Sequence, residues 1–338
     1  MIVATSPSIG TATQWVAIDP NPTTSKYTRD LIAEAASGKE NSAHCLETLF
    51  PSNGKRIGFG TAGLRSEMKP GPLGMNDLTV CQTAQGLAKY CLKKGQLQGA
   101  AQKEKLSSRL CAVVGYDHRS NQSMNISSLS FAILTAIVFA EAGIDCILLE
   151  GFILTPLVPF AIQQLGAVCG IMITASHNPK QDNGYKVYAS DGCQIRAPMD
   201  EDIANEILEN LQPWKNYGAI IEERRHNYPN DPTLGLGRGQ TTKEMLDDYF
   251  IALESGGLKT GQANIPTTIS SGHENGPLNP PPSFAYTAMH GVGHPFAKRA
   301  FEVFGLAPFR AVPEQMEPDP SFPTGMFDAI LATYYLKT

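Results

Sequence analysis

A hydroxyl group that could act as a nucleophile stands among polar residues at the end of a predicted buried strand. The apolar run 171–174 is typical of such a strand, and Ser176, His177 and Asn178 follow it. Pro179 disfavours the helical region for the residue before it, so this polar cluster is expected in a loop. A serine there needs a base, a metal ion or a lowered pKa before it can attack a substrate.

The next predicted strand contributes a positively charged side chain to the same region. Turn-forming residues at 182–184 precede the run 185–188, which carries Lys186. The serine and the lysine are therefore expected at one edge of a sheet. A serine hydrolase that uses Ser176 and His177 is a weak alternative, because adjacent residues on an extended loop point in different directions and no G-x-S-x-G motif is present.

The glycine-dense segment 57–65 is a second candidate for anion binding. Its glycines let the backbone approach an anion closely, and Arg65 at its end offers a planar fork for phosphate oxygens. The alternative is a tight turn that carries a solvated arginine.

Predicted strands alternate with predicted helices, which favours an α/β fold with a substantially parallel sheet. The elements expected around the serine loop are strands at 110–116 and 144–149, helices from 76, at 127–142 and at 160–165, and a polar linker at 93–108. Because ligands of such sheets bind at the carboxyl ends of the strands, segments 117–121, 154–156 and 176–178 are expected to share one rim. Asp117 and His118 could ligate a metal or act as acid and base there, but orienting the loop is the interpretation we favour.

The 338 residues are enough for about two domains. We expect an N-terminal helical arm over 1–50 and, over 51–213, a three-layer α/β domain with a mixed, largely parallel sheet. A partial second domain of the same type is expected over 214–324, with a flexible insertion at 256–283 rich in Gly, Ser, Thr, Asn and Pro.

Composition argues against several classes of partner. The formal charge of −5 and the lack of a Lys/Arg-rich block argue against nucleic acid. The N-terminus does not resemble a secretory signal, and no apolar run approaches the roughly 20 residues of a membrane span. The seven cysteines are scattered without metal-ligand spacing. A cytoplasmic protein is expected; the sequence predicts nothing about its oligomeric state.

Five motifs together resemble the α-D-phosphohexomutase superfamily, in its phosphoglucomutase and phosphopentomutase branch. They occur in family order and are G-F-G-T-A-G-L-R (58–65), M-N-D-L-T-V (75–80), T-A-S-H-N-P-K-Q-D-N-G-Y-K-V-Y (174–188), M-H-G-V-G-H (289–294) and V-P-E-Q-M-E-P-D-P-S-F-P-T (312–324). The resemblance implies an isomerase of carbohydrate metabolism that interconverts aldose 1-phosphates and their terminal phosphates. It also implies a phosphoserine enzyme, a sugar bisphosphate intermediate and activator, and Mg²⁺.

The resemblance assigns roles to individual residues. Ser176 would carry the phosphoryl group and contribute one ligand to Mg²⁺, while Arg65 would clamp the transferring oxygens. His177 and Lys186 would assist proton transfer or stabilise charge, and Asn178 would orient the loop. The expected sugar-phosphate-binding residues are these same five. The family counterpart of His290 is interpreted as structural or positioning.

The chain departs from the family pattern after Thr324. Family members continue with a D-x-D-x-D-R loop that binds the metal, followed by sugar-recognition and phosphate-binding domains, but residues 325–338 do not match this pattern and no triple-aspartate loop occurs in the 338 residues. We therefore expect a C-terminally truncated member with a divergent tail, inactive as a mutase on its own. The alternative function is that of an inactive fragment or a sugar-phosphate-binding or interaction module.

Overall fold

The structure is a computed structural model that describes residues 6–61, 63–101, 110–227, 241–258 and 283–324. The expected insertion at 256–283 lies almost wholly outside these residues, and so does the tail at 325–338. The chain forms two compact units that divide after residue 239. Within the described residues, no helix is both long enough and apolar enough to cross a bilayer.

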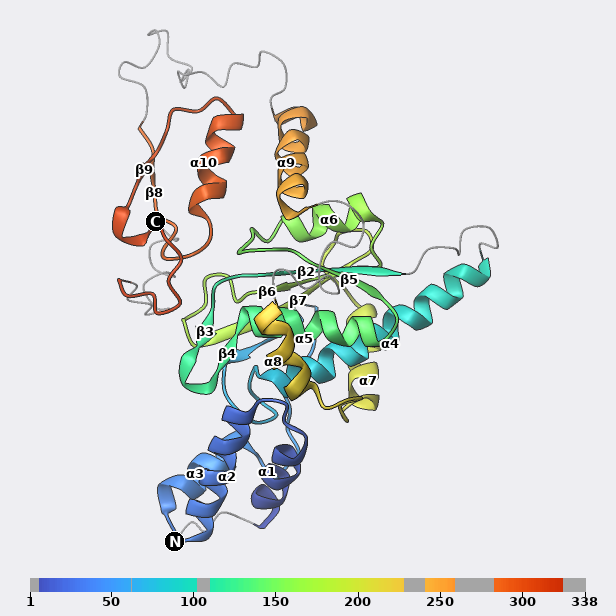
Figure 1. Ribbon diagram of the computed structural model, residues 1–338, viewed down its shortest axis with the longest axis vertical. Coiled ribbons are helices and arrows are strands. Elements are labelled where there is room, and N and C mark those ends of the chain that lie inside the picture. The colour runs from blue at the N-terminus through green and yellow to red at the C-terminus, as the bar shows by residue number, and fades with distance from the viewer. Residues whose placement is uncertain (1–5, 62, 102–109, 228–240, 259–282, 325–338) are drawn as a thin grey trace. The chain divides into compact units, whose positions relative to one another are not determined.

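The first unit contains eight of the described α-helices and seven of the described strands (Figure 1). The helices are α1 (Ser6–Ile18), α2 (Pro22–Ala36), α3 (Glu40–Leu49), α4 (Asp77–Ala101), α5 (Ser128–Glu141), α6 (Leu157–Leu165), α7 (Met199–Glu209) and α8 (Tyr217–Asn227). The strands are β1 (Leu64–Glu67), β2 (Cys111–Tyr116), β3 (Ser120–Asn121), β4 (Ile126–Ser127), β5 (Asp145–Leu148), β6 (Cys169–Ile173) and β7 (Asp182–Ala189), with a 3₁₀ turn η1 (Gln122–Met124) between β3 and β4.

Five of these strands form one mixed sheet in the order β1-β7-β6-β2-β5. Strand β2 runs parallel to both β5 and β6, whereas β7 is antiparallel to β6 and to β1. All strands of this sheet except β7 therefore point the same way. The predicted fold class, an α/β domain with a mixed, largely parallel sheet, is confirmed.

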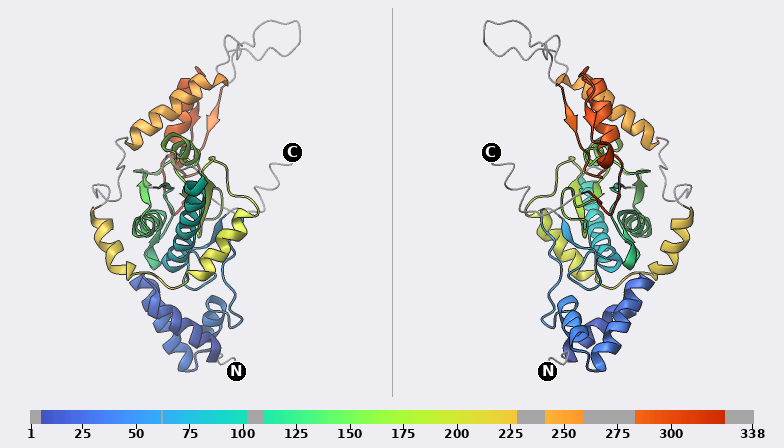
Figure 2. Two further views of the ribbon diagram at one scale, coloured as in Figure 1. Left: turned by 90° about the vertical axis from the view of Figure 1, so that its right-hand side faces the viewer. Right: turned by 90° about the vertical axis from the view of Figure 1, so that its left-hand side faces the viewer.

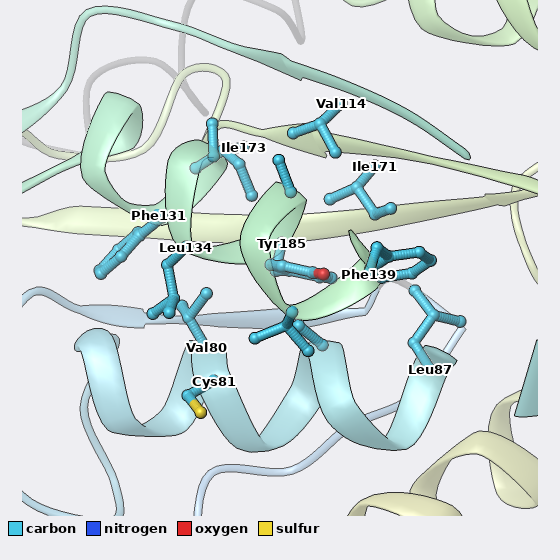
Figure 3. Packing of buried hydrophobic residues seen from close by; sticks show 14 of the residues in the cluster. Val80, Cys81, Leu87, Val114, Phe131, Leu134, Phe139, Ile171, Ile173 and Tyr185 are labelled. Atoms are coloured by element: carbon cyan, nitrogen blue, oxygen red, sulfur yellow. The ribbon is translucent and has the colours of Figure 1, made fainter. Parts of the chain in front are cut away.

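The sheet is covered on both faces. Helices α4 and α5 pack on one face, where Leu87, Phe139 and Tyr185 meet in the buried core (Figure 3). Helix α6 lies on the opposite face (Figure 1). It can approach closely because Gly115 and Gly170 have no side chain: a Cβ atom at either position would lie within 3 Å of aliphatic carbons beneath that helix.

Helices α1 to α3 form a small cluster of their own around Trp15, Leu46 and Phe50, which Leu78 of α4 joins. The amide of Asn21 caps α2 and also donates to the Asp77 carboxylate at 2.8 Å. The expected helical arm is thus held against α4 by both apolar and polar contacts.

Two local expectations were wrong. The segment predicted as a linker from residue 93 continues α4 to Ala101, and the ammonium of Lys93 pairs with Glu206 of α7, which lies alongside α4 (Figure 2). The expected turn at 182–184 is instead the start of β7. Gly184 fits there because a Cβ atom would lie 2.5 Å from the carbonyl oxygen of Thr174.

The second unit contains the remaining described elements. They are α9 (Thr242–Leu253), a π-helical turn η2 (Glu254–Leu258), β8 (Ala285–Tyr286), α10 (His294–Val303), β9 (Arg310–Ala311) and a 3₁₀ turn η3 (Pro313–Gln315). Strands β8 and β9 pair in parallel, and Phe284, Phe301 and Phe309 pack edge to face beside them. A parallel strand pair with a connecting helix is the start of an α/β arrangement.

Candidate active site

Ser176 sits in the loop that follows β6, in a strained backbone conformation. Its φ angle is +53°, and a residue with a side chain pays about 1–2 kcal/mol to adopt this left-handed region. The Thr174 hydroxyl accepts a hydrogen bond from the Ser176 amide at 2.9 Å. The side chain of Ser176 is exposed, so its hydroxyl group is available to a solute.

Lys186 reaches this hydroxyl from the neighbouring strand. Its Nζ donates to Ser176 Oγ at 2.6 Å. Burial lowers the pKa of the half-buried Lys186 ammonium, and the positive charge of Arg65 lowers it further. An arriving anion would relieve both costs, since it would neutralise the charge that burial and repulsion disfavour.

Arg65 belongs to β1, which pairs with β7 and so lies beside the serine loop. In the antiparallel register Arg65 faces Gly184, and its guanidinium donates to Asn178 Oδ1 at 3.0 Å. The amide of Asn178 donates in turn to the Asp182 carboxylate at 2.8 Å. The structure thus joins Arg65 and Asn178 in one network and places the Lys186 ammonium on the Ser176 hydroxyl.

Arg119 holds the serine loop from beneath, and its role was not anticipated. Its side chain is 1% exposed and donates to four backbone carbonyl groups. The acceptors are the carbonyl oxygens of Ser176, Asn178, Pro179 and Asp182, at 2.8 to 2.9 Å. Four bonds from one charged group to a seven-residue segment offset the strain at Ser176.

A buried polar network fixes Arg119 itself. Asp117 Oδ2 lies 3.3 Å from the guanidinium Nε, and Asp117 Oδ1 accepts from the Arg119 amide and from the Ser128 hydroxyl. Burial lowers the pKa of Arg119, and the charge of Asp117 opposes this shift. The amide of Asn183 in β7 donates to the same Ser128 hydroxyl at 3.0 Å. Asp117 therefore orients the loop, as favoured from the sequence.

Of the three histidines named from the sequence, His177 and His290 differ in their surroundings. His177 is exposed and makes no side-chain hydrogen bond to another residue in the described ranges. His290 is 3% exposed, and its Nε2 lies 2.7 Å from the Thr324 hydroxyl. Its backbone also bonds to Gln315 and Asp319, so His290 ties together the 315–324 segment of the second unit. These contacts agree with a structural role.

The three predicted loops do lie at one edge of the sheet. Arg119 connects the loop after β2 to the loop after β6. The amide of Ile153, after β5, donates to the carbonyl oxygen of Tyr116 at 3.3 Å, and the rings of His118 and Phe152 contact edge to face. Parallel strands bring their carboxyl ends together, which is why this expectation could be made from topology alone.

The site does not fit Mg²⁺ as it stands. Among the described residues no group of three or more His, Cys, Asp or Glu side chains could hold a metal ion. The Ser176 hydroxyl, the ligand that the resemblance implies, is in contact with the Lys186 ammonium, which would repel a cation.

The fold and the site together define a three-layer α/β domain with a solvent-facing serine in an electropositive rim. Comparison with family models identifies the family within this class. Residues 56–213 match the model described as phosphoglucomutase/phosphomannomutase, alpha/beta/alpha domain I, and residues 272–330 match domain II of the same family. The chain belongs to the phosphoglucomutase/phosphomannomutase family.

Curated relatives agree with this assignment. The human phosphopentomutase is 39% identical over 313 residues, covering 92% of this chain and 44% of the relative. The human glucose 1,6-bisphosphate synthase is 36% identical over 324 residues (94% and 45%), and the phosphoribomutase of Saccharomyces cerevisiae is 36% identical over 324 residues (92% and 44%). The chain thus spans less than half the length of these relatives.

Solved structures support the fold alone. A proposed phosphomannomutase from Thermus thermophilus superposes with a TM-score of 0.54 at 24% identity, covering 80% of this chain and 48% of the other. A phosphoglucomutase/phosphomannomutase family protein from Burkholderia thailandensis gives a TM-score of 0.50 at 18% identity (78% and 45%).

Proposed function

We propose that this chain is the phosphoryl-carrying part of a sugar-phosphate mutase of carbohydrate metabolism. Ser176 takes a phosphoryl group from an aldose bisphosphate and returns it to a sugar monophosphate, so that the 1-phosphate and the terminal phosphate interconvert. The names of the relatives, phosphopentomutase, phosphoribomutase and glucose 1,6-bisphosphate synthase, support this class of substrate. Because the seven cysteines are all free, a reducing compartment such as the cytoplasm suits the protein.

The contact between Lys186 Nζ and Ser176 Oγ carries the proposal. In-line phosphoryl transfer depends mainly on positioning and on neutralising the charge of the three equatorial oxygens. The Oγ–P bond forms as the P–O bond to the sugar breaks, and the serine proton is transferred to the departing sugar oxygen. Lys186 is placed to donate to an oxygen at either stage, and its lowered pKa eases proton transfer.

Arg65 and His177 complete the proposed binding surface. Arg65 is exposed within hydrogen-bond distance of Asn178, so its guanidinium can turn its free donors toward a phosphate. His177 is exposed beside Ser176 and is assigned to the sugar or its phosphate on this position alone.

Phosphopeptide mapping tests the proposal. The purified chain is incubated with glucose 1,6-bisphosphate, quenched in acid, digested and analysed by mass spectrometry. We expect one phosphoryl group, on Ser176, and none in the Ser176→Ala variant. Phosphate on another residue, or equal uptake by the variant, would contradict the assignment.

A sugar-phosphate-binding module is the second candidate. The lack of a metal-ligand cluster among the described residues favours it, because transfer without a metal ion lacks a major source of counter-charge. For this reason we expect negligible mutase turnover of glucose 1-phosphate or ribose 1-phosphate by the 338-residue chain alone. Calorimetry and the phosphopeptide mapping together separate the candidates. A binding module binds the sugar monophosphate in calorimetry but shows no phosphate on Ser176 in the mapping after incubation with the bisphosphate.

A further inference from the structure

Two buried thiols lie in contact at the end of the sheet away from Ser176. Cys91 is on α4, Cys169 is the first residue of β6, and their sulfur atoms are 3.6 Å apart. We infer that Cys91 and Cys169 are a redox-active pair that a peroxide converts to a reversible disulfide joining α4 to β6.

The geometry selects this pair among the buried cysteines. A disulfide brings its sulfurs to about 2.05 Å, so the two atoms must approach by only about 1.5 Å. Cys146 is on the same side of the sheet, but both Cys146 and Cys169 are register partners of Ala112, one on each flanking strand. Two strand spacings separate them, about 9.6 Å, which exceeds the roughly 7 Å limit between bridged Cα atoms.

Cys111 is excluded in a different way. It precedes Ala112 in β2, so its side chain points to the opposite face of the sheet, where its Sγ lies 3.9 Å from the Leu165 carbonyl oxygen at the end of α6. Among the four cysteines at this end of the first unit, Cys91 and Cys169 are the pair for which the structure records a contact between sulfur atoms.

A cavity gives small molecules a route to the two sulfurs. It has a volume of about 210 Å³ and is lined by both cysteines together with residues of α4, β7 and α7. Lys94 and Ser190 on its wall are exposed, so the cavity reaches the surface. A peroxide is small enough for this route.

The chemistry balances with hydrogen peroxide as the oxidant. The Cys91 thiolate attacks one peroxide oxygen, the O–O bond breaks, and Cys91 sulfenic acid and water form. The Cys169 sulfur then attacks the Cys91 sulfur, the S–O bond breaks, the disulfide forms, and a second water leaves with the Cys169 proton. Two thiols are oxidised by two electrons and one peroxide is reduced to two waters.

The state of Cys169 makes Cys91 the thiol that reacts first. Its contact with Cys91, together with burial, raises the pKa of the Cys169 thiol. Cys169 therefore stays protonated while Cys91, which is slightly more exposed (5% against 3%), meets the oxidant first.

Oxidation is tested on the full chain with Cys45 and Cys193 replaced by serine, since these are the two cysteines that are not buried. After exposure to hydrogen peroxide, free thiols are trapped in acid with N-ethylmaleimide and the digest is analysed by mass spectrometry. We expect a crosslink between the peptides of Cys91 and Cys169, reversed by dithiothreitol, and a melting temperature raised by several degrees because a long loop is closed.

Three further substitutions in this background make the test specific. Cys91→Ser and Cys169→Ser should each abolish the crosslink, and Cys146→Ser should retain it. The inference is overturned if both thiols stay free, if each is oxidised separately to sulfinic acid, or if the crosslink joins Cys146 or Cys111 instead. The mapping on the parent chain decides the outcome even if a variant does not fold.

Discussion

Replacement of Arg119 by methionine should release the serine loop while leaving the rest of the first unit folded. The change removes a buried guanidinium that donates to four carbonyl groups between residues 176 and 182. It also leaves the Asp117 carboxylate without the charge that lies 3.3 Å from it.

The size of the effect follows from these contacts. A hydrogen bond to a charged group contributes about 1.5–3 kcal/mol, and removing one partner of a buried ion pair costs about 3–5 kcal/mol. The bonds share one donor group, so their contributions do not add. We expect Arg119→Met to destabilise the loop by about 4 kcal/mol, enough to raise its amide exchange rate by up to about 10³-fold.

Hydrogen exchange measured by mass spectrometry locates the effect. Exchange in Arg119→Met should accelerate in peptides that cover 174–184 and change little in α1 to α3. Arg196→Met is the matched control, because the Arg196 and Asp191 side chains of that ion pair are 65% and 48% exposed and the pair should contribute under about 1 kcal/mol. Asp117→Asn combined with Arg119→Met should cost less than the sum of the single changes, since no unpaired carboxylate remains.

Two results would refute this reasoning. One is exchange at 174–184 that is the same in Arg119→Met and the parent chain. The other is a destabilisation as small as that of Arg196→Met, which would mean that the carbonyl bonds of Arg119 are replaced by water at no cost.

Two further predictions concern backbone shape and buried charge. Gly63→Ala should destabilise the chain by about 3 kcal/mol or more in denaturant unfolding, because its Cβ atom would lie 1.9 Å from the Tyr185 carbonyl oxygen. Gly54→Ala is the control: Gly54 has a similar positive φ but lies in open space, so this change should cost about 1 kcal/mol. Equal costs for the two variants would contradict this prediction. Burial raises the pKa of Asp19 from 3.8 to about 7, with a smaller contribution from Asp77, so the native state keeps a proton that the unfolded chain releases. Stability should therefore fall from about pH 4 to pH 7, and Asp19→Asn should flatten this profile and raise the unfolding free energy at pH 8 by about 2 kcal/mol; an unchanged profile would show that Asp19 ionises normally.

The sequence was sufficient to predict which loops share the rim of the sheet, because this prediction needs only the positions of the strand ends and the direction of each strand. A buried apolar run that ends in polar residues shows where a strand stops, and parallel strands share that edge. This is why the loops that contain Ser176 and Asp117 were expected together and are joined by Arg119.

The role of Arg119 could not be predicted in the same way. Its partners are backbone carbonyl groups nearly 60 residues further along the chain, and every residue has such a group. Only its place two residues after Asp117 at a strand end was visible. The extension of α4 was missed for another reason. Residues 93–101 contain two glycines among good helix formers, and the ion pair between Lys93 and Glu206 depends on the distant helix α7.

The rate of phosphoryl uptake by Ser176 tests the central claim most directly. In a single-turnover reaction with glucose 1,6-bisphosphate, intact-mass measurement follows the addition of one phosphoryl group to the parent chain, to Lys186→Met and to Lys180→Met, an exposed lysine of the same loop. We predict uptake in the parent, a loss of about 100-fold in Lys186→Met and a change within about twofold in Lys180→Met. Equal rates in the two lysine variants, or no uptake by the parent chain, would contradict the account.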